Sequence, residues 1–114
     1  MRLLLDECVP ARLRRSLPGH QVSTVVVEGW SGVKNGELLA LAGANFDAFI
    51  TVDKNLPYQQ STAKLPIAVL VLDAVSNELP YLVPLVPALE AALSKVAKGS
   101  YVLVAPLNRH NASD

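Results

Sequence analysis

The chain of 114 residues is short of cysteine, of aromatic side chains and of long apolar runs. Its single cysteine, Cys8, excludes an internal disulfide and is typical of a reducing compartment. No apolar run approaches the roughly 20 residues that a membrane span requires, and the run that opens MRLLLDECVP is too short for a secretion signal. We therefore expect a cytoplasmic protein with no membrane partner.

An excess of charge of either sign is also missing, because 10 basic and 10 acidic residues give a formal net charge of zero. Proteins that coat nucleic acid usually carry a basic excess, so any contact with RNA must come from local clusters. Two groups of basic residues qualify: Arg12, Arg14 and Arg15 in one segment, and Lys34, Lys54 and Lys64 near the acidic residues discussed below. A solvated helix face explains the arginine cluster equally well.

Hydrophobic residues, by contrast, make up 51% of the chain, against 18% charged residues. This composition argues against disorder, and the length fits one domain that buries a core without disulfides. We expect a single domain over residues 1–106, followed by a polar tail over 107–114 that frays.

Apolar and β-branched runs alternate with helical segments along the chain. The runs predict five strands, at 2–5, 21–27, 47–52, 67–72 and 101–105. The segments between them predict three helices: 10–17 with Pro10 in its first turn, 36–43 capped by Asn35, and 87–97 with Gly99 at the C′ position. This order predicts an α/β fold, a three-layer sandwich in which helices cover both faces of a mostly parallel sheet of about five strands.

Carboxylates follow three of the predicted strands, as Asp6, Asp53 and Asp73. If the first strand is central, the ends of the first and third strands open onto a switch-point crevice, where Asp6 and Asp53 face each other. Glu37 falls in the first turn of the helix at 36–43, where the helix dipole favours a negative charge. Carboxylates held close together repel one another, and Mg²⁺ or Mn²⁺ removes that conflict because both ions prefer oxygen ligands.

Each of these acids also has a purely structural explanation. An aspartate at a strand end often begins a turn, and a glutamate in a first helical turn often serves only the dipole. Asp73 is expected to be peripheral, and Glu7 to point away from Asp6, although it is a possible second ligand. Asp47 begins its strand and is therefore expected at the opposite edge of the sheet, in a structural role.

Several motifs, taken in order, resemble those of the PIN-like nucleases, in particular the short bacterial families of predicted toxins akin to VapC. The matching segments are LLLDECVP (3–10), GHQV (19–22), GWSG (29–32), NGELLALA (35–42) and FDAFITVDKNL (46–56). The resemblance implies that residues 1–106 form a PIN-like domain with a ribonuclease site dependent on Mg²⁺ or Mn²⁺. It also implies a small antitoxin protein as partner, and a possible homodimer.

Carried over residue by residue, the resemblance makes Asp6, Glu37 and Asp53 the metal ligands and catalytic acids. Thr51 matches the threonine two residues before the last of these acids, and its hydroxyl would steady the site by hydrogen bonding. Lys34, Lys54 and the arginine cluster would then hold the RNA backbone, with an affinity that falls as salt rises.

Two positions depart from the pattern of similar sequences, which commonly carry aspartate where this chain has Asn35 and Asn55. Each asparagine can still offer a carbonyl oxygen at the rim of the site, but each removes a negative charge and so weakens Mg²⁺ binding. One alternative is therefore a non-enzymatic interaction module, whose Leu- and Pro-rich stretch at 79–93 forms a dimer or partner surface.

Another alternative is a phospho-accepting receiver domain, in which Asp53 takes a phosphoryl group with the help of Mg²⁺. Acids after the first strand and Pro57 fit that class, but the required Ser or Thr after the fourth strand and Lys after the fifth are replaced by Asp73-Ala74 and Ala105-Pro106.

Other chemistry-bearing residues have weaker patterns. A zinc site built from Cys8, His20 and His110 lacks ligand-like spacing, and Cys8 is expected to be a small buried hydrophobe. Trp30 and Tyr58 are candidates for stacking on RNA bases, while Trp30 equally suits an anchor for its own loop or for a partner's pocket.

Overall fold

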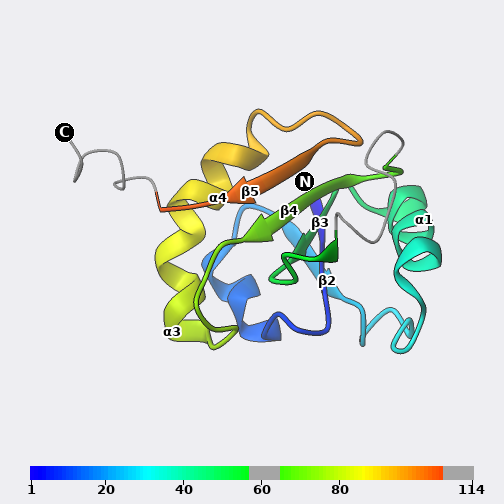
Figure 1. Cartoon of the computed structure of the whole chain (residues 1–114), viewed down its shortest axis with the longest axis horizontal. Coiled ribbons are helices and arrows are strands. Elements are labelled where there is room, and N and C mark those ends of the chain that lie inside the picture. Colours follow the sequence, from blue (N-terminus) through cyan, green and yellow to red (C-terminus); the bar gives the residue numbers. More distant parts are fainter. Residues whose placement is uncertain (57–64, 107–114) are drawn as a thin grey trace.

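A computed structural model describes residues 1–56 and 65–106. Within them a single sheet has the strand order β2-β1-β3-β4-β5, with every neighbouring pair parallel (Figure 1). The strands are β1 (Arg2–Leu5), β2 (Gln21–Thr24), β3 (Ala48–Thr51), β4 (Ala68–Leu72) and β5 (Tyr101–Val104). This is the order of flavodoxin-like doubly wound sheets, in which the strand order reverses between β1 and β3.

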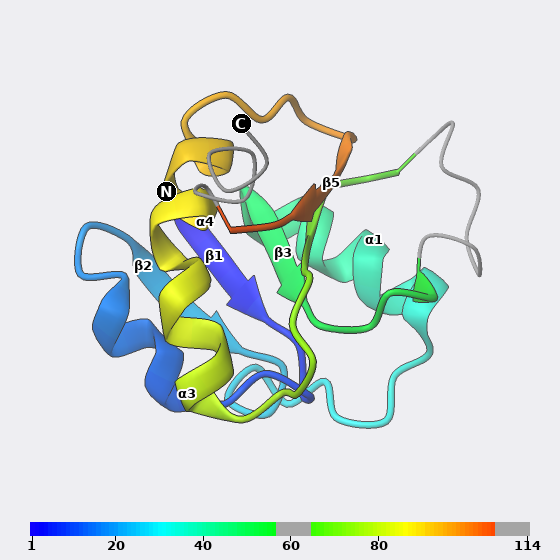
Figure 2. The same ribbon diagram turned by 60° about the vertical axis from the view of Figure 1, so that its left-hand side comes forward.

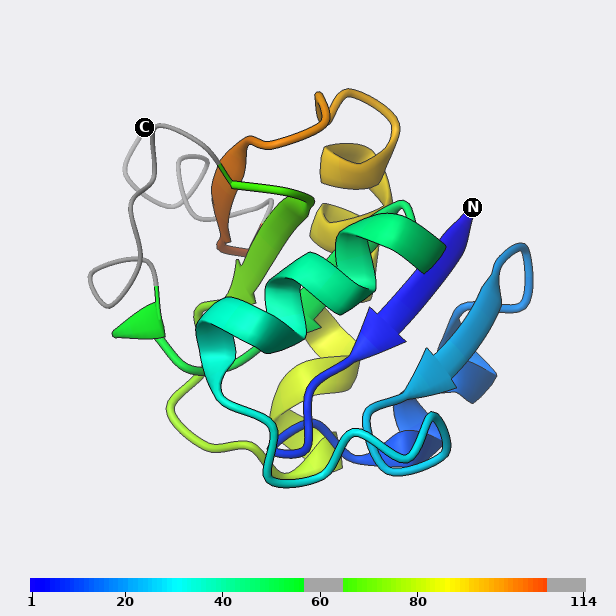
Figure 3. The same ribbon diagram turned by 90° about the vertical axis from the view of Figure 1, so that its right-hand side faces the viewer.

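Helices cover both faces of the sheet, as the sequence predicts. One face lies under α1 (Asn35–Asn45), which crosses in front of the strands in Figure 3. The opposite face lies under four shorter helices (Figure 2). These are η1 (Ala11–Ser16), α3 (Leu79–Leu82), η3 (Val83–Leu85) and α4 (Val86–Leu93). The three-layer α/β prediction is therefore confirmed.

The hydrophobic core is divided by the sheet into two clusters, and the alternation of side chains along the strands decides which cluster each residue joins. In β1, Leu3 and Leu5 pack toward the short helices, whereas Leu4 packs toward α1. All residues of β3 and β4 are buried. Strands buried on both faces explain why these segments are apolar throughout.

The second strand is shorter than predicted. It ends at Thr24, and Val26 and Val27, expected inside it, are 63% and 71% exposed. The Thr24 hydroxyl accepts the Val27 N–H at 3.0 Å, and the Thr24 carbonyl accepts the Glu28 N–H at 3.0 Å. A turn closed by the threonine side chain thus outweighs the strand propensity of the valines.

The predicted helix bounds and caps need several corrections. The segment predicted at 10–17 is the 3₁₀ helix η1, with Pro10 at its cap rather than in its first turn. Helix α1 already includes Asn35, so Lys34, not Asn35, occupies the cap. The helix predicted at 87–97 is α4 (Val86–Leu93), and the segment before it is helical too.

The physical reason for that extra helix is the position of the prolines. Each proline of the segment stands in the first turn of its own short helix, where its missing N–H needs no partner. Gly99 lies beyond the end of α4 and is not its C′ residue. It has φ +81° in the turn before β5, where a Cβ would come within 2.9 Å of the Leu65 carbonyl oxygen.

No helix among residues 1–56 and 65–106 is long and apolar enough to span a membrane. The predicted tail at 107–114 lies outside the described residues, as do Pro57, Tyr58, Lys64 and His110.

Candidate functional site

The carboxyl ends of β1 and β3 lie side by side, at the point where the strand order of the sheet reverses. The Asp6 N–H continues their hydrogen-bond ladder to the Ile50 carbonyl at 2.9 Å. Because side chains alternate along a strand, Asp6 follows Leu4, and Thr51 follows Phe49, onto the face covered by α1. The predicted crevice at the ends of these strands therefore holds Asp6 next to Thr51.

The hydroxyl of Thr51 joins the two aspartates of the predicted site. Its side chain is fully buried, and it donates a hydrogen bond to Asp6 Oδ2 at 2.7 Å. The same oxygen accepts the Asp53 N–H at 3.0 Å. One hydroxyl has one donor and two acceptor positions, so a single buried group can bind both neighbours. Thr51 thus holds the Asp6 carboxylate two hydrogen bonds away from the backbone of Asp53.

The Asp53 carboxylate is oriented by the turn that follows it. Its Oδ1 accepts the Asn55 N–H at 2.9 Å, which is the geometry of an Asx turn. Asn55 therefore supports the site through its backbone, while its side chain is exposed. The carboxylate is half-buried and keeps lone pairs beyond this one bond, so it remains able to bind a cation.

Asp6 receives further hydrogen bonds from its own turn. Oδ1 accepts the Glu7 N–H at 2.8 Å, and the Cys8 thiol lies 3.6 Å from Oδ2 and 3.5 Å from the Thr51 hydroxyl oxygen. Burial raises the pKa of the Cys8 thiol, so it stays a neutral donor beside the carboxylate. Cys8, expected to be a small buried hydrophobe, is half-buried and packs against the core beneath the short helices, and its thiol also contacts the site.

Glu37 lies on the same face of the sheet as Asp6. It is exposed in the first turn of α1, which runs opposite to β1 and so begins at the carboxyl end of the strands (Figure 3). Within residues 1–56 and 65–106, however, no three side chains of the types His, Cys, Asp and Glu gather closely enough to hold a metal ion. The described structure thus joins Asp6 with Asp53 and leaves Glu37 outside that cluster. Asn35, the first residue of α1, is half-buried.

Lys54 has a partner that the sequence pattern does not indicate. Its Nζ lies 2.8 Å from Asp73 Oδ1, and it donates to the Ala74 carbonyl at 3.4 Å. Asp73 follows β4, the strand next to β3, so this ion pair bridges the ends of two neighbouring strands. Asp73 therefore holds the lysine that was expected to hold RNA.

The loop before α1 is fastened to the site and to the core. The Oε1 of Glu7 accepts the Gly32 N–H at 3.3 Å, so this side chain reaches the loop before α1. Trp30 packs against the α1-side core, with its ring edge-on to Phe46 at 6.1 Å. The tryptophan thus anchors its own loop, which is one of the roles that the sequence predicts for it.

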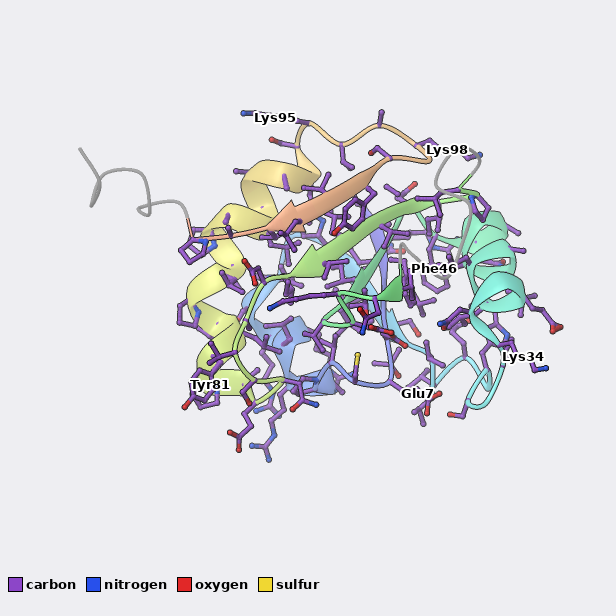
Figure 4. All side chains as sticks on the ribbon, in the orientation of Figure 1. Glu7, Lys34, Phe46, Tyr81, Lys95 and Lys98 are labelled. Atoms are coloured by element: carbon purple, nitrogen blue, oxygen red, sulfur yellow. The ribbon has the colours of Figure 1, made fainter. Side chains whose placement is uncertain are left out.

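The predicted RNA-binding residues do not form one surface. Arg12, Arg14 and Arg15 are exposed on η1, in the layer opposite α1. Lys34 is exposed just before α1 and extends from the other layer (Figure 4). The arginines and Lys34 thus lie in layers on opposite sides of the sheet.

Comparisons with protein-family models, with curated proteins and with solved structures give no match for this chain.

The donor set at the strand ends is nevertheless chemically suited to a hard cation. Asp6 and Asp53 supply carboxylate oxygens fixed by hydrogen bonds from Thr51, Glu7 and Asn55. Mg²⁺ is usually bound through one or two carboxylates, with water and substrate phosphate oxygens completing its shell. The carboxylate oxygens at this edge are thus the type of donor that Mg²⁺ and Mn²⁺ prefer.

Proposed function

We propose that the chain is a PIN-like endoribonuclease dependent on Mg²⁺ or Mn²⁺, and the toxin half of a toxin–antitoxin pair. The observation that carries the proposal is the buried Thr51 hydroxyl, which donates to the Asp6 carboxylate and accepts the Asp53 backbone N–H at the switch point of the sheet. Ligands usually bind at this point in doubly wound sheets. The order of motifs described above supports the family, and a small antitoxin protein is proposed as partner.

Asp6 and Asp53 would hold the metal directly in this function. When bound, the metal supplies positive charge to the phosphodiester and lowers the pKa of a bound water. Glu37, exposed at the same end of the sheet, would serve as the third acid by contacting a water of the shell. Thr51 keeps the two aspartates in place before substrate arrives, so little reorganisation is needed during the reaction.

The basic residues would contact the RNA backbone from outside the acidic edge. Lys34 and the arginines Arg12, Arg14 and Arg15 are exposed and suited to phosphate. Lys54 is half-exposed and already paired with Asp73, so its first role is to fix the turn after β3. It would reach RNA only by leaving that ion pair.

A receiver domain remains the second candidate, because the strand order and the position of Asp53 after β3 are those of that class. Asp73 stands at the end of β4, where such domains need a hydroxyl. Its carboxylate forms an ion pair with Lys54. This arrangement favours the nuclease over phosphoryl transfer to Asp53.

The decisive experiment measures cleavage of mixed-sequence RNA while Mg²⁺ or Mn²⁺ is titrated. We expect activity to rise with metal, to vanish in EDTA, and to fall at least about 100-fold in Asp6→Asn and in Asp53→Asn, since each loses ~3 kcal/mol of transition-state stabilisation. Asp47→Asn is the matched control, because Asp47 lies at the opposite edge and its Oδ2 accepts the Arg2 N–H.

Cleavage that persists in EDTA, or that is unchanged in both site variants, would contradict the proposal. Labelling of Asp53 by acetyl phosphate, without RNA cleavage, would instead identify a receiver.

A further inference from the structure

The two edge strands of the sheet, β2 and β5, differ in the side chains that they carry. Gln21 and Ser23 of β2 are polar, and the Ser23 hydroxyl donates to the Glu28 carboxylate at 2.7 Å. By contrast, β5 has the sequence YVLV, with no charged residue and no proline. Charged side chains, prolines and bulges are the usual means by which proteins protect a sheet edge from pairing with another chain. The charges and prolines that usually protect an edge are therefore missing from β5.

The hydrogen bonds of β5 show which of its backbone groups face away from the sheet. The Ser100 and Val104 carbonyls accept the N–H groups of Val69 and Asp73, each at 2.8 Å. Alternate residues of a parallel strand bond the same neighbour, so the N–H and C=O of Leu103 point outward from the edge. Within residues 1–56 and 65–106, no strand lies on that side of β5.

The side chains along this edge are apolar. Val102 and Val104 pack against the core beneath the short helices, so Tyr101 and Leu103 alternate onto the other face, where they are 37% and 48% exposed. On the helical side, a shallow groove of about 220 Å³ opens between α4 and β5. Its lining is mostly small and apolar, with contributions from Ala88, Ala91, Ala92, Val102 and Val104. A strand added beside β5 would therefore place one set of side chains in this groove and the alternate set next to Leu103.

The charges near β5 are all of one sign. Between Ala91 and Pro106 the only charged residues of the sequence are Lys95 and Lys98. Both are exposed on the connection from α4 to β5 (Figure 4), and Lys95 also lines the groove. Because the chain as a whole has a net charge of zero, this local excess favours an occupant that carries acidic residues.

We propose that β5 accepts an extended, acidic segment of a different protein as an additional strand of the sheet. Main-chain hydrogen bonds to Leu103 give affinity, an apolar side chain of the segment enters the groove beside α4, and a carboxylate of the segment pairs with Lys95 or Lys98. In strand addition of this kind, alternate side chains give specificity. None of these residues belongs to the acidic site, so the inference is independent of the nuclease.

The probe for this edge is a fluorescent synthetic peptide of about eight residues, the length of an ordinary strand. Valine alternates with threonine in it, and two glutamates end the sequence. Titration of the full-length chain, followed by fluorescence anisotropy, should show saturable binding, about tenfold weaker when lysines replace the glutamates. The same peptide with methyl groups on its backbone nitrogens should not bind, because it has lost the donors that pair with a strand.

A proline in β5 tests the role of the outward backbone. Leu103→Pro removes an N–H that does not bond β4, a position at which an edge strand tolerates proline, and it should weaken peptide binding at least about tenfold. The matched control is Val22→Pro in β2. The Gln21 N–H bonds the Met1 carbonyl, so that of Val22 points away from β1, and its loss should leave peptide binding unchanged.

A charge reversal repeats the test without altering the backbone. Lys95→Glu should weaken binding of the glutamate peptide several-fold and strengthen binding of the lysine peptide. Urea unfolding of each variant checks that it remains folded. On addition of the glutamate peptide to the wild type, amide hydrogen exchange should slow at Leu103 and not at Val22.

Three results would overturn the inference: no binding of the glutamate peptide, equal binding of the methylated peptide, or equal loss of binding in the two proline variants. A dimer of the wild type that Leu103→Pro abolishes would overturn it as well, because the edge would then belong to a second copy of the chain.

Discussion

The two ends of the sheet use the same residue type, aspartate, in different ways. At the amino end, the Asp47 carboxylate accepts the Arg2 N–H at 2.7 Å, and the Asp47 N–H binds the Arg2 carbonyl at 2.7 Å. At the carboxyl end, Asp6 accepts the Glu7 N–H and is also bound by the side chains of Thr51 and Cys8. The first aspartate satisfies backbone groups, whereas the second belongs to a polar cluster that reaches the surface.

The two ends also differ in how closely the backbone is packed. At the amino end, a Cβ on Gly43 would lie 2.5 Å from the Pro66 carbonyl oxygen, and one on Gly99 would lie 2.9 Å from that of Leu65. At the carboxyl end, an ion pair between Lys54 and Asp73 joins neighbouring strands. Backbone segments thus approach each other closely at the amino end, whereas side chains join the strands at the carboxyl end.

Gly43→Ala should have the largest effect on stability. Alanine favours a helix by ~1 kcal/mol over glycine, but the overlap with the Pro66 carbonyl must shift backbone, and we expect a net loss of about 2 kcal/mol. The measurement is the midpoint of urea unfolding, compared between variants whose dependence of the unfolding free energy on urea has the same slope. Gly19→Ala is the control, because a Cβ at that position would meet no atom within 4 Å, and it should change stability by less than ~0.5 kcal/mol. Equal values for the two would disprove the close-packed amino end.

Thr51→Val should follow, with an effect on both stability and the proposed activity. The change keeps the shape but leaves the Asp53 N–H and Asp6 Oδ2 without their shared partner, at a cost of about 2 kcal/mol. RNA cleavage should fall with it. Thr51→Ser keeps the hydroxyl, so it should lose only ~1 kcal/mol and retain cleavage. If Ser and Val behave alike, the hydroxyl does not organise the site.

The smallest effect concerns the thiol at the carboxyl end. Burial raises the pKa of Cys8 above its ordinary value of 9.0, with the Asp6 carboxylate adding to the shift. The unfolded thiol therefore ionises before the folded one, so this residue lowers stability as pH rises through 9.0 and upward. Alkylation by iodoacetamide near that pH should be several-fold slower in the folded chain than in urea, because the thiolate is the reactive form. Equal rates would place the thiol in solvent.

Much of the fold could be predicted because the strands are buried on both faces. Segments such as AVLVL in β4 must be apolar throughout, and this signal needs no tertiary knowledge. The end of β2 could not be predicted in the same way. Val26 and Val27 have high strand propensity, but the hydroxyl of Thr24 closes a turn there. Strand propensity depends on context, and the local hydrogen bond decided the outcome.

The site was predictable in part for a similar reason. Asp6 and Asp53 follow apolar strands, and parallel strands end at one edge, so their approach follows from topology. The pairing of Lys54 with Asp73 depends on which strand lies next to β3, and the role of Cys8 depends on how the turn after β1 folds back. Neither leaves a pattern in the sequence.

The sequence by itself determined the parallel three-layer architecture and the edge at which Asp6, Thr51 and Asp53 gather, because hydrophobic burial and strand direction are encoded locally. Only the tertiary structure decided that one buried hydroxyl joins the two aspartates, that Glu37 lies outside their cluster, and that the uncharged strand β5 forms an edge of the sheet. These features depend on distances of a few ångströms between segments far apart in the chain, which residue order alone does not specify.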